Sequence, residues 1–296
     1  MKNTYQPQHR TEPARVLVFD SGVGGLTILQ AIRQRFPQCS LFYGCDNAAF
    51  PYGNKDEGEL LERVDLVVHQ MQEATDADII VVACNTASTI ALPLIRQRFT
   101  MPIIGVVPAI KPAAKLSQSK VIGLLATLGT IRRDYTGHLI NTFASNCEVV
   151  SLGSPELVDM AEQKLRGGTV NPALVESILA PFTHNPKIDT VVLACTHFPL
   201  LQAELQKILP DVVHWVDSGE AVARRVGHWV DELGLAEIPT SPQATTAYFT
   251  EENDDIQNLI PNLNDFGIQR VNYLEIQPAK ETDRLNDPYA KSMTSF

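Results

Sequence analysis

Apolar residues along this chain gather in short runs that amphipathic stretches separate. The runs are rich in β-branched residues, and several are apolar at nearly every position, which predicts parallel strands buried on both faces. We expect strands over residues 15–19, 41–44, 78–83, 102–107, 120–125, 148–152, 189–194 and 212–216. Helical spacing recurs between them, at Leu26, Leu29, Ile32 and Phe36 and at Leu60, Val64, Val67 and Met71. This alternation predicts a doubly wound α/β fold, in which ligands bind beyond the carboxyl ends of the strands.

A weak internal repeat predicts two similar halves. The segment VLVFDSGVGGL is followed by IIVVACNT, and VIGLLATLGTI is followed in the same way by TVVLACTH. In each unit a strand opens into a turn of small residues, and a later strand ends in Ala-Cys and two polar residues. Two copies cannot form a solenoid, so we expect two α/β domains that face each other.

The length of 296 residues also agrees with two domains. Prolines and loop residues near 100–101 and 210–211 mark the expected crossings, so the first domain would comprise residues 1–100 and 211–296 and the second residues 101–210. Residues 1–14 are polar and predict a flexible extension. From about Ser241 the helical periodicity ends, and we expect an edge strand over 246–250 and then a loosely held tail.

Charge and cysteine content limit the classes of function. The chain has 24 Lys and Arg against 34 Asp and Glu, a formal net charge of −10, which argues against nucleic-acid or anionic-membrane surfaces. No run approaches about 18 apolar residues, and the polar start lacks the apolar region of a secretory signal. We therefore expect a cytoplasmic protein without a membrane span. The five cysteines include no Cys-x-x-Cys pair, so we expect neither a disulfide framework nor a metal site.

Two of the cysteines stand where chemistry is expected. Cys84 and Cys195 each end a predicted buried strand, at the point where the next helix should begin. The helix dipole favours thiolate over thiol there, so we expect lowered pKa values for both. A single buried cysteine usually serves as a small apolar residue. Matching positions in the two halves of the repeat favour a chemical role for this pair.

The glycine-rich turn DSGVGG begins at Asp20, directly after the first predicted strand. It has features of a dinucleotide-binding loop, but Thr27 occupies the position of that motif's last glycine. Asp46, at the end of the second strand, could then bind a ribose. A second interpretation is a tight turn that needs glycine for a positive φ. In a third, Asp20 and Ser21 place a carboxylate and a hydroxyl at the strand end while backbone N–H groups approach an anion.

Two further segments could complete a site at the same edge of the sheet. FPYGNK, over residues 50–55, combines an aromatic residue, turn residues and an amide, and is a candidate wall of a ligand pocket. His197 follows Cys195 by two residues and is expected in the first turn of the next helix. Its ordinary pKa of about 6.5 and its nearness to a thiol make it a candidate for proton transfer.

Taken together, the segments DSGVGGL, PYGNK, ACNTAS and ACTHFPLL resemble the signature segments of the glutamate racemases, which are cofactor-independent amino-acid racemases. The resemblance spans about residues 16–225, and motifs in this order are specific. It implies two α/β domains with the active site in the cleft between them, and no cofactor. It also implies the interconversion of L-glutamate and D-glutamate, which supplies D-glutamate for peptidoglycan. A homodimer is expected from the resemblance and, as in some relatives, control by a cell-wall precursor.

The resemblance also assigns roles to individual residues. Cys84 would take the α-proton from D-glutamate, and Cys195 would take it from L-glutamate. Asp20 would assist Cys84, whereas His197 and Glu162 would support Cys195. The positions that match substrate-binding residues of the family are Asp20, Ser21, Tyr52, Gly53, Asn85, Thr86, Thr196 and His197.

Physical chemistry agrees with these roles. Inverting a stereocentre by proton transfer needs a base on one face of the carbon and an acid on the other, and thiols can serve as both. Without a cofactor, N–H donors at two helix N-termini would have to stabilise the charge that builds on the α-carboxylate. Three alternatives remain open at this stage: a sibling racemase that acts on aspartate, a nucleotide-dependent oxidoreductase, and an amino-acid-binding protein without catalysis.

Overall fold

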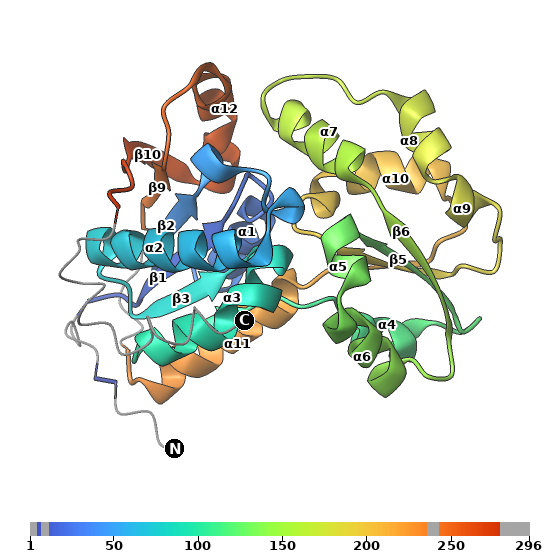
Figure 1. The fold of residues 1–296 in the computed structure, drawn as a ribbon, viewed down its shortest axis with the longest axis horizontal. Coiled ribbons are helices and arrows are strands. Elements are labelled where there is room, and N and C mark those ends of the chain that lie inside the picture. The colour runs from blue at the N-terminus through green and yellow to red at the C-terminus, as the bar shows by residue number, and fades with distance from the viewer. Residues whose placement is uncertain (1–4, 7–11, 236–242, 279–296) are drawn as a thin grey trace.

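The chain folds into two bodies, each built around one parallel β-sheet (Figure 1). A computed structural model gives this fold and describes residues 5–6, 12–235 and 243–278. The first sheet has the strand order β10-β9-β2-β1-β3-β4, and the second has the order β6-β5-β7-β8. The strand pairs between described residues are all parallel. The predicted architecture of two α/β domains is confirmed.

The strands expected from the apolar runs all form. The first sheet contains β1 (Arg15–Asp20), β2 (Ser40–Cys45), β3 (Ile79–Val82), β4 (Ile103–Gly105), β9 (Thr245–Phe249) and β10 (Ile268–Tyr273). The second contains β5 (Val121–Ala126), β6 (Glu148–Gly153), β7 (Thr190–Ala194) and β8 (His214–Val216). Along β1, Val16 and Val18 join one apolar core, while Leu17 and Phe19 join another. Burial on both faces explains why the central strands are apolar at nearly every position.

Helices cover both faces of the first sheet. One face packs against α1 (Leu26–Arg35), α11 (Gly219–Glu232) and α12 (Asp254–Leu263). The other face packs against α2 (Glu57–Thr75) and α3 (Asn85–Arg98). Two short 3₁₀ helices, η1 (Asn47–Ala49) and η2 (Tyr52–Asn54), lie in the connection from β2 to α2. The helical spacing seen in the sequence at residues 26–36 and 60–71 is therefore that of α1 and α2.

The second sheet is covered in the same manner. One face packs against α4 (Ile110–Leu116) and α6 (Asp134–Phe143). The other packs against α7 (Pro155–Leu165), α8 (Pro172–Ile178), α9 (Ala180–Thr183), η3 (Phe198–Leu201) and α10 (Gln202–Ile208). The short helix α5 (Leu128–Arg132) contacts α3 and η2 of the first domain. The two domains therefore meet along the carboxyl ends of their central strands.

The internal repeat corresponds to a shared strand order. Strands β2-β1-β3-β4 of the first sheet have the same arrangement as β6-β5-β7-β8 of the second. In both, the strand that precedes the small-residue turn lies directly beside the strand that ends in Ala-Cys. As a result, the two polar segments of each repeat reach the same sheet edge, as expected for parallel strands.

Sheet membership locates the crossings between the domains. β4 pairs in the first sheet, and β8 pairs in the second. After β8 the chain returns through α11 to the core of the first domain. We therefore propose domain boundaries near residues 106–109 and 217–218, a few residues beyond the expected crossings at 100–101 and 210–211.

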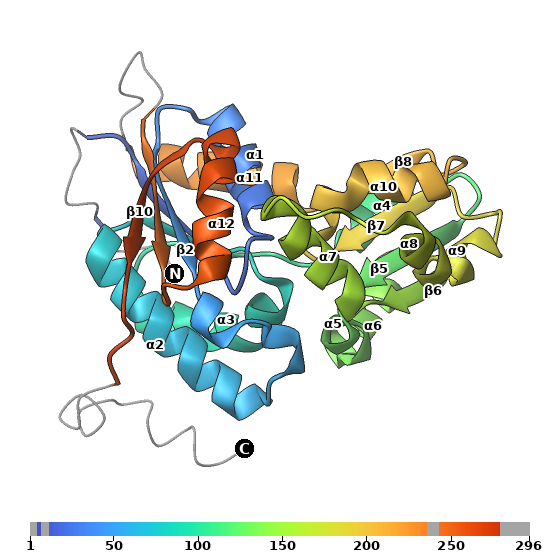
Figure 2. The same ribbon diagram turned by 90° about the horizontal axis from the view of Figure 1, so that it is seen from above.

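The expectation for the C-terminal part was wrong in two respects. β9 does form close to residues 246–250, but it lies inside the sheet between β2 and β10 and is not an edge strand. Residues 254–273 are no loose tail, because α12 and β10 bury Ile256, Leu259 and Ile268 in the first core. Figure 2 shows β10 at the outer edge of the first domain. The end of the expected tail, residues 279–296, lies outside the described residues.

Most of the expected N-terminal extension, residues 1–4 and 7–11, also lies outside the described residues. Within the described part, the Tyr5 hydroxyl donates to Asp78 Oδ1 at 3.2 Å, and the backbone N–H of Arg15 donates to Oδ2 of the same carboxylate at 2.9 Å.

Among the residues that the structure describes, no helix has both the length and the apolar character that a membrane span requires.

Candidate active site

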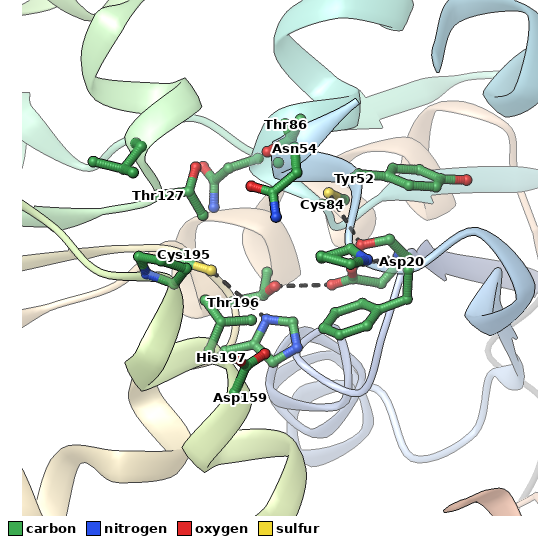
Figure 3. A pocket seen from close by; sticks show the side chains of 18 residues that line it. Asp20, Tyr52, Asn54, Cys84, Thr86, Thr127, Asp159, Cys195, Thr196 and His197 are labelled. Carbon is green, nitrogen blue, oxygen red and sulfur yellow. Dashed lines mark hydrogen bonds between the residues drawn. The ribbon is translucent and has the colours of Figure 1, made fainter. Parts of the chain in front are cut away.

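A cavity of about 270 Å³ lies where the carboxyl ends of the two sheets meet. Figure 3 shows the sulfur atoms of Cys84 and Cys195 facing this cavity from the two domains. Of the site residues expected from the sequence, those that line it are Asp20, Ser21, Tyr52, Gly53, Cys84, Asn85, Thr86, Cys195, Thr196 and His197. Glu162 is not in the lining and lies behind His197. The cavity is near the lower end of the usual range for ligand pockets, which suits a small metabolite.

Cys84 occupies the N-cap position of α3, directly after β3. Its side chain accepts from the backbone N–H of Ala87 at 3.5 Å, and the hydroxyl of Ser21 lies 3.7 Å from its sulfur. The expected lowering of its pKa is not found. Burial, and next the negative charge of Asp20, raise the pKa of the Cys84 thiol to about 12, against the opposing effect of the Ala87 N–H. Near neutral pH Cys84 is therefore a thiol.

Asp20 is fully buried at the end of β1. Its Oδ1 accepts from the backbone N–H of Ser21 at 2.6 Å, and its Oδ2 accepts from the Thr196 hydroxyl at 2.8 Å. Burial raises the pKa of Asp20 above its ordinary value, although the charge of His197 and these hydrogen bonds oppose this rise. The carboxylate joins the two domains through Thr196 and reaches Cys84 by way of Ser21.

Cys195 has a different local setting from the one expected. No α-helix starts at residue 196; Thr196 and His197 form a turn, η3 follows, and α10 begins only at Gln202. A helix N-terminus therefore stands behind Cys84 but not behind Cys195. The partner of Cys195 is a side chain, since its sulfur lies 3.6 Å from Nδ1 of His197.

His197 and Glu162 form a buried pair behind Cys195. Their Nε2 and Oε1 atoms are 2.8 Å apart, and both side chains are about 4% exposed. Burial alone would lower the pKa of His197, but hydrogen bonds with Cys195 and Glu162 raise it well above its ordinary value. For Glu162, burial is outweighed by the hydrogen bond and charge of His197, so that its pKa is lowered. An imidazolium and a carboxylate thus support each other next to the thiol.

The glycine-rich turn allows the two domains to approach each other closely. None of Gly22, Gly24 and Gly25 has a positive φ, so the interpretation based on φ was wrong. A Cβ atom at Gly22 would collide with Oε1 of Glu162, and one at Gly24 would lie 2.8 Å from the backbone nitrogen of His197. The absence of side chains here lets the first domain reach the residues that support Cys195.

The wall formed by PYGNK is held by Asp46, which is completely buried. Oδ2 of Asp46 accepts from the Tyr52 hydroxyl at 2.6 Å and from Nε of Arg63 at 2.9 Å. Oδ1 accepts from Nη2 of Arg63 at 2.6 Å and from the Thr250 hydroxyl at 2.8 Å. A carboxylate with all these partners is not available to a ribose, which removes the basis for the nucleotide interpretation.

The cavity also has wall residues that none of the sequence motifs had indicated. They are Thr127, Leu128, Pro155, Val158 and Asp159, whereas Phe50, Pro51 and Asn54 belong to the wall segment that the sequence predicted. Thr127 could have been found, because it directly follows β5, as Ser21 directly follows β1 in the repeat. Asp159 precedes Glu162 by one helical turn on α7 and carried no signal of its own.

The cavity offers donors and acceptors to an amino acid. Asn85 is buried in the first turn of α3, and its Oδ1 has no hydrogen-bond partner in the described part of the chain. This free acceptor can receive an ammonium N–H, while Ser21, Thr86 and Thr196 offer hydroxyl groups. No cluster of His, Cys, Asp and Glu with the character of a metal site occurs among the described residues.

Comparison with known proteins places this geometry in a family. The model of the Asp/Glu/hydantoin racemase family matches residues 26–226. The chain is 50% identical to the glutamate racemase of Photorhabdus laumondii over 88% of its own length and 90% of that protein. The crystal structure of Escherichia coli glutamate racemase with L-glutamate and the activator UDP-MurNAc-Ala is similar, with a TM-score of 0.84 and 44% identity over 90% of this chain and all of that one. A Bacillus anthracis glutamate racemase is similar at a TM-score of 0.78 and 28% identity, over 92% of this chain and all of that one. Since the family model and these relatives cover most of its length, the chain belongs to the Asp/Glu/hydantoin racemase family, and within it to the glutamate racemases.

Proposed function

We propose that this racemase inverts glutamate with two thiols, Cys84 and Cys195, which act on opposite faces of the α-carbon without a cofactor. The observation that carries the proposal is that both thiols open onto one small cavity from different domains. An inversion by proton transfer needs a base and an acid on opposite faces. Two thiols that approach one carbon from different domains meet that requirement.

The proton balance gives each thiol two roles. With L-glutamate, the Cys195 thiolate takes the α-proton, and the electron pair of the C–H bond stays on the α-carbon. The Cys84 thiol then donates its proton to the other face, which gives D-glutamate and leaves Cys84 as thiolate. With D-glutamate the same steps run in reverse. The raised pKa of Cys84 agrees with a proton donor ready for L-glutamate.

The negative charge of the intermediate needs donors that are fixed in advance. The first turn of α3 supplies backbone N–H groups and the side chains of Asn85 and Thr86. We propose that these groups bind the amino and carboxyl groups of the substrate together with Ser21 and Thr196. The backbone around Tyr52 and Gly53 would bind the side chain of glutamate. In this arrangement one helix N-terminus, that of α3, takes the place of the two expected from the sequence.

Three further polar residues, Asp20, His197 and Glu162, position the thiols. We propose that Asp20 acts on Cys84 through Ser21, and that His197 acts on Cys195 with Glu162 behind it. The supporting contacts are the 3.7 Å approach of Ser21 to Cys84 and the 3.6 Å approach of His197 to Cys195. Each thiol thus has its own supporting set.

We also propose the cellular setting that the resemblance implies. The enzyme would be a cytoplasmic homodimer that supplies D-glutamate for peptidoglycan. A cell-wall precursor would regulate it, since the similar E. coli racemase was crystallised with UDP-MurNAc-Ala as activator. Sedimentation with and without UDP-MurNAc-Ala tests the dimer, and initial rates measured at increasing UDP-MurNAc-Ala test the activation.

The proposed reaction is tested by incubating the protein with one glutamate enantiomer in D₂O. We expect deuterium at the α-carbon and formation of the other enantiomer, with no added cofactor. A binding protein without catalysis would give neither. Faster turnover of D-aspartate than of D-glutamate would contradict the proposed substrate and favour a sibling racemase.

A further inference from the structure

Arg166 follows the C-terminal end of α7 and lies between the two domains. Its Nη2 is 2.8 Å from Oε2 of Glu162, and its Nη1 is 3.1 Å from Oδ2 of Asp255. Glu162 belongs to the second domain, whereas Asp255 is in the first turn of α12 in the first domain. The guanidinium thus connects a residue behind the catalytic thiol with the other domain.

A second contact joins the same two helices. Nδ2 of Asn262 on α12 donates to the carbonyl oxygen of Leu165 at 2.7 Å. Figures 1 and 2 show α12 on the side of the first domain that faces α7. The end of α7 is therefore fixed to the first domain by a charged contact at Arg166 and a neutral contact at Leu165.

The two oxygens of the Glu162 carboxylate have different partners. Oε1 faces Nε2 of His197 and accepts from the backbone N–H of Val23 at 2.9 Å. Within the described residues, the hydrogen bond of Oε2 comes from Arg166 alone. Without that guanidinium, the buried carboxylate of Glu162 would keep its charge with one oxygen unpaired, or would rotate away from His197.

We propose that Arg166 is a positioning residue for the Cys195 half of the reaction. It holds Glu162 in the orientation that keeps His197 against Cys195, and Asp255 makes this orientation depend on the approach of the two domains. This inference rests on the proposed two-thiol mechanism. It assigns to Arg166 a role that neither its position outside the cavity nor its partial exposure of 22% reveals.

Isotope effects can separate the two halves of the reaction. The two enantiomers have equal free energies in water, so kcat/KM must be the same in both directions for any variant. A variant that slows only the Cys195 step makes that step limit the rate in both directions. The C–D bond of α-deuterated L-glutamate breaks at Cys195, so its isotope effect should rise. The C–D bond of α-deuterated D-glutamate breaks at Cys84, so its isotope effect should fall.

The test compares Arg166→Met with the wild-type enzyme. We expect kcat/KM to fall about tenfold in both directions, the loss expected for one charged hydrogen bond. The isotope effect on kcat/KM should rise for α-deuterated L-glutamate and fall for the D-enantiomer. Arg166→Lys, which keeps the charge, should restore part of both the rate and the isotope effects. Asp255→Asn should shift both quantities in the same sense by a smaller amount.

The matched control is Arg35→Met, which breaks an exposed ion pair with Glu220 on the first domain. It should leave rates and isotope effects unchanged. Thermal melting shows whether each variant is folded, and Asp255→Asn carries the test if Arg166→Met does not fold. Isotope effects that stay as in the wild type, despite a lower rate, would overturn the role of Arg166. Failure of the proposed mechanism itself would appear earlier, as a wild-type enzyme without α-proton exchange.

Discussion

The Cys84 and Cys195 halves of the active site have similar sequences but different surroundings. Cys84 caps a helix, contacts Ser21 and has the carboxylate of Asp20 as its charged neighbour. Cys195 directly precedes a turn and contacts the imidazole of His197, whose pKa is raised by hydrogen bonds with Cys195 and Glu162. One thiol thus has an anion nearby, and the other has a cation.

This difference shows that the repeated Ala-Cys segment fixes the place of a thiol but not its electrostatics. The carboxylates that set the charge come from elsewhere in the chain: Asp20 from the end of β1, and Glu162, which pairs with His197, from α7. A racemase needs unlike protonation states at its two thiols at the start of each turnover, because one must accept a proton and the other must donate one. Neighbours of opposite charge next to the two thiols can produce these unlike protonation states.

The largest expected effect comes from replacing either thiol. Cys84→Ser or Cys195→Ser should lower kcat/KM about 10³-fold, because a serine hydroxyl is a poor acid and base near neutral pH. The loss should be equal in both directions. The measurement is the change in optical rotation of L- and D-glutamate.

The double variant, with both cysteines changed to serine, should lose little more than either single variant, because both groups serve one sequence of proton transfers. A single variant that keeps more than about a tenth of the activity would remove that cysteine from the mechanism. It would also end the comparison between the two halves.

A smaller and unequal effect is expected when the supporting residues are changed. His197→Asn removes a charged partner from Cys195 and should lower kcat/KM about 100-fold. Ser21→Ala removes a neutral contact at 3.7 Å from Cys84 and should cost about tenfold or less. Steady-state rates with both enantiomers, on variants checked by thermal melting, give the comparison. Equal losses in the two variants would show that charge at His197 does not distinguish the halves.

The smallest effect is expected in the rate at which iodoacetamide alkylates Cys84. This rate should rise about tenfold for each pH unit. Only the thiolate reacts, and a raised pKa keeps the thiol form to higher pH. The pKa of about 12 predicts that the rate still rises above pH 9.0, the ordinary value at which a free thiol would level off. Mass spectrometry of the Cys84 peptide follows the rate, with Cys84→Ser as the blank. A plateau near pH 9 would contradict the raised pKa.

The sequence predicted the fold and most of the cavity wall for a clear reason. Parallel strands buried on both faces require apolar runs, and their carboxyl ends gather whatever polar residues follow them. Asp20, Cys84 and Cys195 could therefore be assigned to one edge of the structure from their places after three such runs. The same reasoning applied to Thr127 would have added it to the wall.

The sequence was less informative where long-range packing decides. β10 has a single buried residue, Ile268, and therefore no apolar run, whereas α12 keeps helical spacing at Ile256, Leu259 and Leu263 that could have been found. The expected helix after Cys195 is replaced by a turn and η3, whose segment contains Pro199. Glu162 came from family resemblance alone, because a glutamate on an amphipathic helix has no local sign of burial.

By itself the sequence determined most of the secondary structure, the two-domain repeat and the positions of the two thiols, because these depend on local periodicity and on residue type. Only the tertiary structure decided which charges face each thiol. Asp20 and Glu162 are 142 residues apart in the chain, yet both form hydrogen bonds with the same turn. Asp20 is bonded to Thr196 and Glu162 to His197. Burial then sets their effect, because a charge removed from water acts strongly on its neighbours, and no sequence pattern records that distance.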